Sequence, residues 1–297
     1  MSWRKNNKVV YGSDDQLFGC IEQTQIQESK PFGRFLDAGT GTHSLRWMAS
    51  LIIGDEIEER HESILKIHEY AAITADKQMQ TNVIYEAKDL GIEGKGEILI
   101  GNWQSKHNNA DSGVGGDEES ELCYNEVYDT ILADYLVGAM DGFSPYYQDQ
   151  IFPRLAKHLT PGGLIHVVGL NPIPDSAPGD ADIFCKVTKL RDACILLAGH
   201  RCYREYPIDW IERHLEKAGL EVVKSSRFPI LYSHWAIVRQ LNVARSKLKL
   251  FPSKALAKEM EGAIDALEKE SKERTDKAPN RRLKLGFDYV VTARKPL

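Results

Sequence analysis

The residues best suited to chemistry form a short acidic and glycine-rich run, Asp37-Ala38-Gly39-Thr40-Gly41. Glycines let a backbone turn sharply and approach a bound ligand closely. The run lies between a short apolar stretch, 33–36, and apolar residues that recur with helical spacing over 45–52. A helix that begins here presents N–H groups and positive potential to a ligand. The sequence therefore predicts a ligand-binding turn between a strand and a helix.

Polar residues also follow three other apolar stretches. Asp76, Asn102-Trp103 and Asp134 each come directly after a run that we interpret as a strand. In an open parallel sheet the carboxyl ends of the strands meet at one edge, where ligands bind. We therefore expect these side chains to gather around the glycine-rich turn.

Strands and helices alternate over the first 225 residues, which predicts a parallel sheet with helices on both faces. The last predicted strand follows a long helical section, 234–277, so we expect an antiparallel strand after a helical insertion. The fold class is then a doubly wound, mostly parallel α/β sheet of seven strands. The predicted strands are 33–37, 70–75, 96–101, 128–133, 164–170, 220–223 and 286–293, and the predicted helices include 55–69, 77–90, 147–159, 182–197 and 207–218.

The expected domain organisation is an N-terminal arm, 1–30, and one catalytic domain, 31–297. That domain carries a flexible acidic loop at 105–121 and a helical lid or insertion at 230–285. The run 160–163, Thr-Pro-Gly-Gly, predicts a tight turn before the fifth strand.

The composition is that of a globular protein, with 297 residues, 42% hydrophobic, 27% charged and a net charge of −5. An acidic chain is a poor general binder of nucleic acid or of anionic membranes. No apolar run is long enough to span a membrane, and no signal-peptide pattern is present. Five widely spaced cysteines without C-x-x-C favour free thiols, a cytoplasmic location and no structural metal.

Several of these segments resemble motifs of the class I S-adenosylmethionine-dependent methyltransferases. Residues 36–42 resemble the first motif of that family, 128–134 the strand that bears its fourth motif, and 159–163 the turn before its fifth strand. The resemblance covers about residues 33–229 and 286–294. It implies a seven-stranded sheet with an antiparallel last strand, methyl transfer as the activity and S-adenosylmethionine as the cofactor.

The resemblance also assigns residues to the methionine part of the cofactor. Gly39 and Gly41 would let the main chain approach it, with Asp37 near its ammonium group. His43 stands where a third glycine is common in the family, and either crowds the helix start or adds a contact. The further cofactor contacts expected around the turn and the second strand end are Thr40, His43 and Lys77.

At the other end of the cofactor, the resemblance assigns Asp76 to the two ribose hydroxyls. A carboxylate suits that role because it only accepts hydrogen bonds and can accept two. Asn102, in place of a frequent acidic residue, would bind adenine, and Trp103 would stack on it. Asp134 and Tyr135 would border both cofactor and substrate.

Methyl transfer requires alignment and exclusion of water more than it requires a dedicated base. The catalytic candidates are therefore placed by position. Asp134 ends a strand, although it could simply cap the next helix. Tyr147 belongs to a predicted helix entry near the same edge, with core packing as the alternative. His234 opens the insertion, where a buried structural histidine is the alternative.

The sequence favours a methyltransferase that acts on N, O or S of a small molecule. Two alternatives remain, an RNA or protein substrate and a non-catalytic scaffold with this fold. A dinucleotide-dependent reductase fits less well, because the third glycine of G-x-G-x-x-G is missing. The polar segment 200–206 is either a substrate contact or a surface ion-pair cluster. The basic stretch 239–258 is interpreted as a lid helix with snorkelling cations.

Overall fold

The structure, a computed structural model, describes residues 15–54, 57–104, 122–123 and 125–297. The expected acidic loop, 105–121, and the first part of the expected arm, 1–14, lie outside the described residues. The strands are β1 (Gly33–Asp37), β2 (Ile67–Thr74), β3 (Gly96–Ile100), β4 (Tyr128–Asp134), β5 (Leu159–Leu170), β6 (Glu221–Ser233) and β7 (Arg282–Arg294). The α-helices are α2 (Gln16–Glu28), α3 (Thr42–Ile53), α4 (Glu59–Leu65), α5 (Lys77–Asp89), α6 (Leu136–Phe143), α7 (Ile151–Lys157), α8 (Asp182–Leu197), α9 (Ile208–Lys217), α10 (His234–Leu248) and α11 (Lys254–Lys277).

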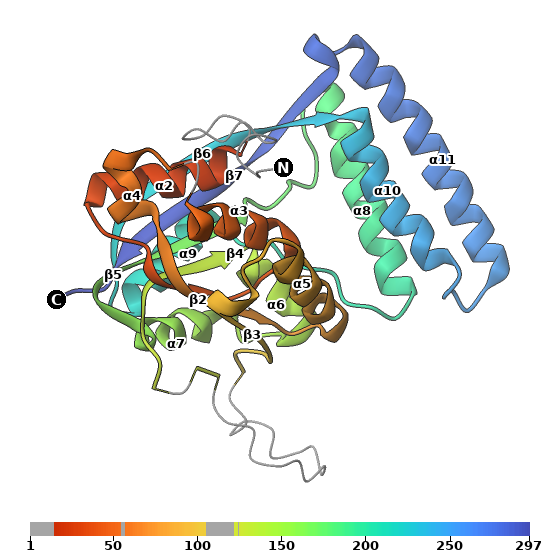
Figure 1. The fold of residues 1–297 in the computed structure, drawn as a ribbon. Coiled ribbons are helices and arrows are strands. Elements are labelled where there is room, and N and C mark those ends of the chain that lie inside the picture. The colour runs from red at the N-terminus through yellow and green to blue at the C-terminus, as the bar shows by residue number, and fades with distance from the viewer. Residues whose placement is uncertain (1–14, 55–56, 105–121, 124) are drawn as a thin grey trace, which may run out of the picture. The chain divides into compact units, whose positions relative to one another are not determined.

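The strands form one seven-stranded sheet in the order β3-β2-β1-β4-β5-β7-β6 (Figure 1). Strand β1 pairs in parallel with β2 and with β4, and the same holds for β2 with β3 and for β4 with β5. Strand β7 is antiparallel. The predicted fold class is thus confirmed, and β1 lies at the centre of the sheet.

Several element boundaries differ from the predictions, and each difference has a local cause. The predicted turn at 160–163 lies inside β5, where the pairing with β4 shifts from Leu159 to Leu164. The Gly162 N–H instead donates to the Lys295 carbonyl at 2.8 Å. This irregular part of β5 therefore pairs with the residue that directly follows β7. Strands β6 and β7 are longer than predicted, and in the added part of β7 exposed Arg282 and Lys284 alternate with buried Leu283 and Leu285.

Two predicted helices also change. Within the described residues 57–69 of the charged helix expected over 55–69, the helix is α4, and it ends before β2 begins at Ile67. The helical section expected over 234–277 is interrupted between α10 and α11. Pro252 lies at the interruption, and the Ser253 hydroxyl accepts the Leu256 N–H at 3.3 Å and so caps the new helix. The predictions for 77–90, 182–197 and 207–218 are confirmed as α5, α8 and α9.

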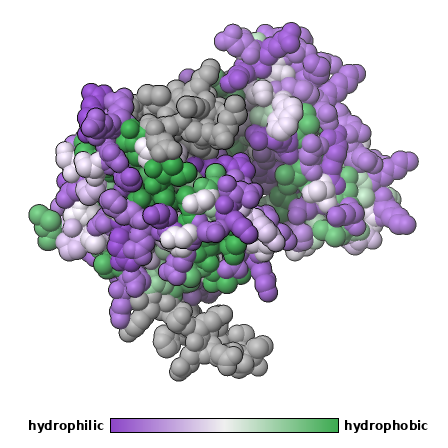
Figure 2. Space-filling view, viewed as in Figure 1, coloured by the Kyte–Doolittle hydropathy of each residue, from purple (hydrophilic) through white to green (hydrophobic). Residues whose placement is uncertain are grey.

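The chain divides into two compact units. Unit 1 comprises 1–169, 206–227 and 289–297, and it holds most of the sheet. Unit 2 comprises 170–205 and 228–288, and its helices α8, α10 and α11 run side by side (Figure 1). A core of buried residues that includes Phe184, Tyr232 and Ile264 holds them together. The surface of α11 is mostly hydrophilic (Figure 2).

Among the described residues, no helix combines the length and the apolar character needed to cross a membrane. Helix α11 has 24 residues, but its sequence is rich in Lys and Glu. All five cysteines are buried free thiols.

A buried polar network ties α2 to the sheet of unit 1. His166 of β5 is 0% exposed, and its Nε2 lies 3.0 Å from Gln25 Oε1 and its Nδ1 2.8 Å from Thr292 Oγ1. The Gln25 amide nitrogen donates to Thr130 Oγ1 and to the Lys30 carbonyl. The amide oxygen of Gln25 can only accept, so the His166 imidazole carries its proton on Nε2 and accepts from Thr292. Burial lowers the pKa of His166 to about 3.

The neutral His166 should make the protein sensitive to acid. The pKa of His166 in the folded protein lies below its value of about 6.5 in the unfolded chain. The contribution of His166 to the free energy of unfolding is therefore fully present above about pH 6.5 and decreases as the pH falls below it. We expect the difference in unfolding free energy between wild type and His166→Gln to shrink by about 2 kcal/mol from pH 7.5 to pH 5. Urea unfolding across that range measures it. Parallel pH profiles for the two proteins would contradict a buried neutral imidazole.

Candidate functional site

The predicted polar residues do lie along one edge of the sheet. Asp37, the last residue of β1, pairs with Ala72 of β2 and Leu132 of β4. Both neighbouring strands extend two residues further, to Thr74 and Asp134. The central strand therefore ends in a notch at the carboxyl edge, and the glycine-rich turn lies in this notch.

The Asp37 side chain is a fully buried carboxylate at 0% exposure. Its Oδ2 accepts the Ser44 hydroxyl at 2.7 Å, and its Oδ1 accepts the Gly39 N–H at 3.4 Å. Burial raises the pKa of Asp37 to about 6, against the hydrogen bonds from Ser44, Thr40 and Gly39, which lower it. The turn thus holds a desolvated negative charge at neutral pH, an arrangement typical of functional sites.

Hydrogen bonds from three elements fix the backbone of the turn. The Ala38 N–H donates to the Leu132 carbonyl at 2.8 Å, and the Thr40 N–H donates to the Ile73 carbonyl at 2.7 Å. The Trp103 indole N–H donates to the Ala38 carbonyl at 2.7 Å. Trp103 is only 3% exposed, so the structure gives it a supporting role behind the turn. That burial leaves little of the ring for the adenine stacking expected of it.

The two glycines of the turn differ in their surroundings. A Cβ at Gly39 would lie 2.9 Å from Leu136 Cδ1 at the start of α6, so close packing accounts for this glycine. A Cβ at Gly41 would meet no atom of the described residues within 4 Å, and the Gly41 backbone is extended, which any residue can adopt. Packing among the described residues therefore does not require glycine at position 41. Close approach of a ligand would require it.

His43 connects the turn to helix α2. Its Nε2 lies 2.7 Å from Asp15 Oδ2, and its ring packs 5.3 Å from the Phe18 ring. Asp15 is itself fixed as the N-cap of α2, where Oδ1 accepts the N–H groups of residues 17 and 18 at 3.2 Å. The hydrogen bond to Asp15 raises the pKa of His43 against partial burial, and the charge of Asp134 raises it further. His43 therefore lies within electrostatic range of the end of β4.

The segment after β4 is backbone-strained. Tyr135 has φ 48° and ψ 19°, in the left-handed region that a bulky residue rarely adopts. Its N–H donates to the Val168 carbonyl at 3.0 Å, which holds it there. Strain of this kind costs about 1–2 kcal/mol and clusters at functional sites. Asp134 and Tyr135 are the residues expected to border cofactor and substrate. They lie beside the turn, because the next residue, Leu136, lies close to Gly39.

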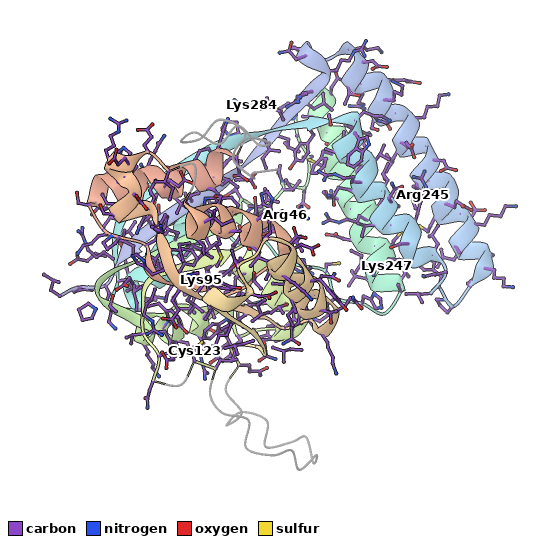
Figure 3. The ribbon with its side chains drawn as sticks, viewed as in Figure 1. Arg46, Lys95, Cys123, Arg245, Lys247 and Lys284 are labelled. Atoms are coloured by element: carbon purple, nitrogen blue, oxygen red, sulfur yellow. The ribbon has the colours of Figure 1, made fainter. Side chains whose placement is uncertain are left out.

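The second and third strand ends carry exposed polar groups. Asp76 is the N-cap of α5, and its Oδ1 accepts the Met79 N–H at 2.6 Å. Lys77 follows as the first, exposed residue of that helix. Asn102 is exposed, and its Oδ1 accepts the Gln104 N–H at 3.0 Å. Arg46 of α3, labelled in Figure 3, pairs with Glu86 of α5 at 2.6 Å and joins the two helices that begin at this edge.

The three catalytic candidates come from different parts of the chain, two from unit 1 and one from unit 2. Asp134 lies partly buried at the end of β4. The Tyr147 hydroxyl accepts from Arg154 of α7 at 3.1 Å, also within unit 1. His234 belongs to unit 2, where its Nδ1 lies 3.0 Å from Ser271 Oγ of α11. The catalytic roles of Tyr147 and His234 and the lid role of 230–285 stay predictions.

Comparison with known proteins supports the topology. No protein-family model matches the sequence, and no curated protein matches it. Among solved structures, YcgJ from Bacillus subtilis superposes with a TM-score of 0.51 at 16% identity, over 93% of this chain and 97% of that one. The chain has the class I methyltransferase fold.

Two weaker likenesses have TM-scores below 0.5, and the assignment of the fold does not depend on them. Coclaurine N-methyltransferase, bound to N-methylheliamine and S-adenosylhomocysteine, gives a TM-score of 0.48 at 12% identity, over 95% of this chain and 73% of its own. A methyltransferase from Geobacter sulfurreducens in complex with S-adenosylhomocysteine gives 0.44 at 14% identity, over 99% and 96% of the two chains.

Sequence reasoning missed two residues of the site. The Ser44 hydroxyl donates to the Asp37 carboxylate and also accepts the N–H of Gly41, the N-cap residue of α3. Its position three residues after Gly41 was the available signal. Asp15, the partner of His43, comes from a weakly patterned segment, and its role depends on a contact 28 residues away. Among the described residues, no group of three or more metal-ligating side chains is assembled.

The Ser44 hydroxyl should stabilise the protein mainly when Asp37 is ionised. We expect Ser44→Ala to cost about 1.5–3 kcal/mol at pH 7, since a bond to a buried charge is lost. The cost should shrink as the pH falls below about 6, because protonated Asp37 needs that donor less. Ser50→Ala is the matched control, because the Ser50 hydroxyl donates to a neutral carbonyl, that of Trp47, in the same helix. Denaturant unfolding that shows the same pH-independent loss for both variants would contradict this role.

Proposed function

We propose that the protein is an S-adenosylmethionine-dependent methyltransferase that acts on an N, O or S nucleophile of a small molecule. The observation that carries the proposal is the turn at residues 37–41, where a buried carboxylate stands beside a glycine that packing in the described part of the chain does not require. Both features lie at the carboxyl end of the central strand, where open α/β sheets bind ligands.

The donor and acceptor groups at this edge fit the cofactor. The cofactor's methionine part carries an ammonium group, and the ionised Asp37 at the base of the turn supplies a negative field for it. The start of α3 directly after Gly41 offers positive potential for the carboxylate. Asp76 has one carboxylate oxygen on the Met79 N–H, which leaves its Oδ2 as an acceptor for ribose hydroxyls.

When bound, S-adenosylmethionine supplies a methyl group already activated on a sulfonium. The chain's own residues then need to orient and desolvate the reactants. Leu136 lies close to Gly39, which brings the Asp134–Tyr135 segment, with Tyr135 in a left-handed backbone conformation, next to the turn. We assign Asp134 to orienting the nucleophile or holding its proton, and Tyr135 to shielding the site from water.

The basic stretch 239–258 gives limited support to an RNA substrate. Arg245, labelled in Figure 3, donates to Asp265 at 2.7 Å and to Glu268 at 2.5 Å, both on α11. A guanidinium held between two carboxylates adds little positive field for phosphates. This contact favours a small-molecule acceptor. We also propose a cytoplasmic location, because all five cysteines are free thiols.

The ribose assignment is tested at Asp76. Asp76→Ala should weaken S-adenosylmethionine binding at least tenfold, but it also removes the cap of α5. Asp76→Ser keeps a capping oxygen while it removes the carboxylate, so it should lose the same affinity with a nearly unchanged melting temperature. Isothermal calorimetry measures the affinity. Wild-type affinity in Asp76→Ser would overturn the ribose assignment, and binding by neither variant nor wild type would count against the proposed function.

A further inference from the structure

One carboxylate joins the start of helix α2 to the start of helix α3. Oδ1 of Asp15 accepts the N–H groups of Leu17 and Phe18 at 3.2 Å and so caps α2. The other oxygen, Oδ2, lies 2.7 Å from Nε2 of His43, in the first turn of α3. Because both oxygens of Asp15 have partners, the carboxylate is fixed in place and in turn fixes the His43 ring.

Ring contacts hold α2 against the same face of α3. The Phe18 ring lies 5.3 Å from the His43 ring and stacks on the Trp47 ring at 4.4 Å. The Trp47 indole N–H donates to Glu22 Oε1 of α2 at 2.9 Å. His43 and Trp47 are four residues apart and therefore share one face of α3. Packing over two turns of each helix thus places Asp15 beside His43, in addition to the ion pair between them.

His43 lies where it can act on a ligand at the glycine-rich turn. It is the second residue of α3, and the turn ends at Gly41, the N-cap of that helix. The side chain of His43 is 63% exposed, whereas that of Asp15 is 16% exposed. Asp15 therefore offers little surface to a ligand, and His43 offers much more.

The charges around His43 favour its protonated form. The hydrogen bond to Asp15 raises the pKa of His43, while partial burial lowers it. The charge of Asp134 raises the pKa and the charge of Arg46 lowers it. Arg46 is itself paired with Glu86 of α5 at 2.6 Å, which reduces its effect. An imidazolium at this position adds positive charge to the positive end of α3.

We propose that Asp15 is a positioning residue for the cofactor: it holds His43 as an imidazolium at the start of α3, where the positive charge attracts the carboxylate of the methionine part. This role of Asp15 rests on the proposed function, and it gives helix α2 a part in cofactor binding. Because solvent screens the exposed His43, the effect on affinity is several-fold and no larger.

The pH dependence of cofactor affinity tests this role. Asp15→Asn keeps a capping side chain on α2 and removes the charge beside His43. At pH 5.5, where His43 is protonated in both proteins, variant and wild type should bind S-adenosylmethionine equally. At pH 7.5 the variant should bind about three- to tenfold more weakly, because its His43 has lost more of its proton. Isothermal calorimetry measures both affinities, and the titrations of Asp37 and of the cofactor cancel in their ratio.

Two further variants control for the loss of charge and for indirect effects. Glu28→Gln is the matched control, because it removes a carboxylate from the other end of α2, where Glu28 pairs with Arg294 of β7 at 3.0 Å. Its affinity should equal that of the wild type at both pH values. In a His43→Gln background, Asp15→Asn should cause no further loss, because the two residues act as one unit.

Several results would overturn the role of Asp15. They are equal affinity of Asp15→Asn and wild type at both pH values, a loss of the same size at both, and an additive loss in the double variant. If Asp15→Asn is unfolded, Asp15→Ser, which also keeps a capping oxygen, replaces it with the same expected loss. Failure of the wild type itself to bind S-adenosylmethionine would overturn the proposed function and this role with it.

Discussion

The burial of the Asp37 carboxylate is the constraint on which the rest of the site depends. A charge at 0% exposure at the end of the central strand must be supported by hydrogen bonds, or its pKa would rise far above the value of about 6 that it has. Ser44 and the Gly39 N–H provide that support, and both belong to the turn and the first turn of α3. The conformation of the turn therefore depends on its hydrogen bonds to the Asp37 carboxylate.

A second set of buried contacts explains why helix α2 belongs to this arrangement. Gln25 of α2 bonds His166 in the sheet, and Asp15 at the start of α2 bonds His43 beside the turn. The helix is thus anchored at both ends by polar contacts rather than by apolar packing alone. Such contacts specify one position, because sliding the helix would leave buried groups unsatisfied. Helix α2, whose sequence has only a weak pattern, therefore helps to hold the glycine-rich turn in place.

The topology could be predicted from the sequence because alternating strand and helix patterns and a glycine-rich turn constrain it strongly. The extent of β6 and β7 could not, because Pro229 and Gly286, residue types that usually interrupt a strand, lie inside them. Contacts between distant segments, such as Asp15 with His43, leave no local pattern. Trp103 illustrates the limit, because the resemblance assigned its ring to stacking on adenine, whereas the ring is buried and its indole N–H donates to the Ala38 carbonyl.

The central claim is that the turn at Asp37 binds S-adenosylmethionine. The most direct measurement is calorimetric titration of the full-length wild-type protein with S-adenosylmethionine, and in parallel with NAD, at pH 7.5. The account predicts saturable binding of S-adenosylmethionine at one site and none of NAD. Binding of NAD with no heat from S-adenosylmethionine would contradict it, and would assign this turn to dinucleotide chemistry instead.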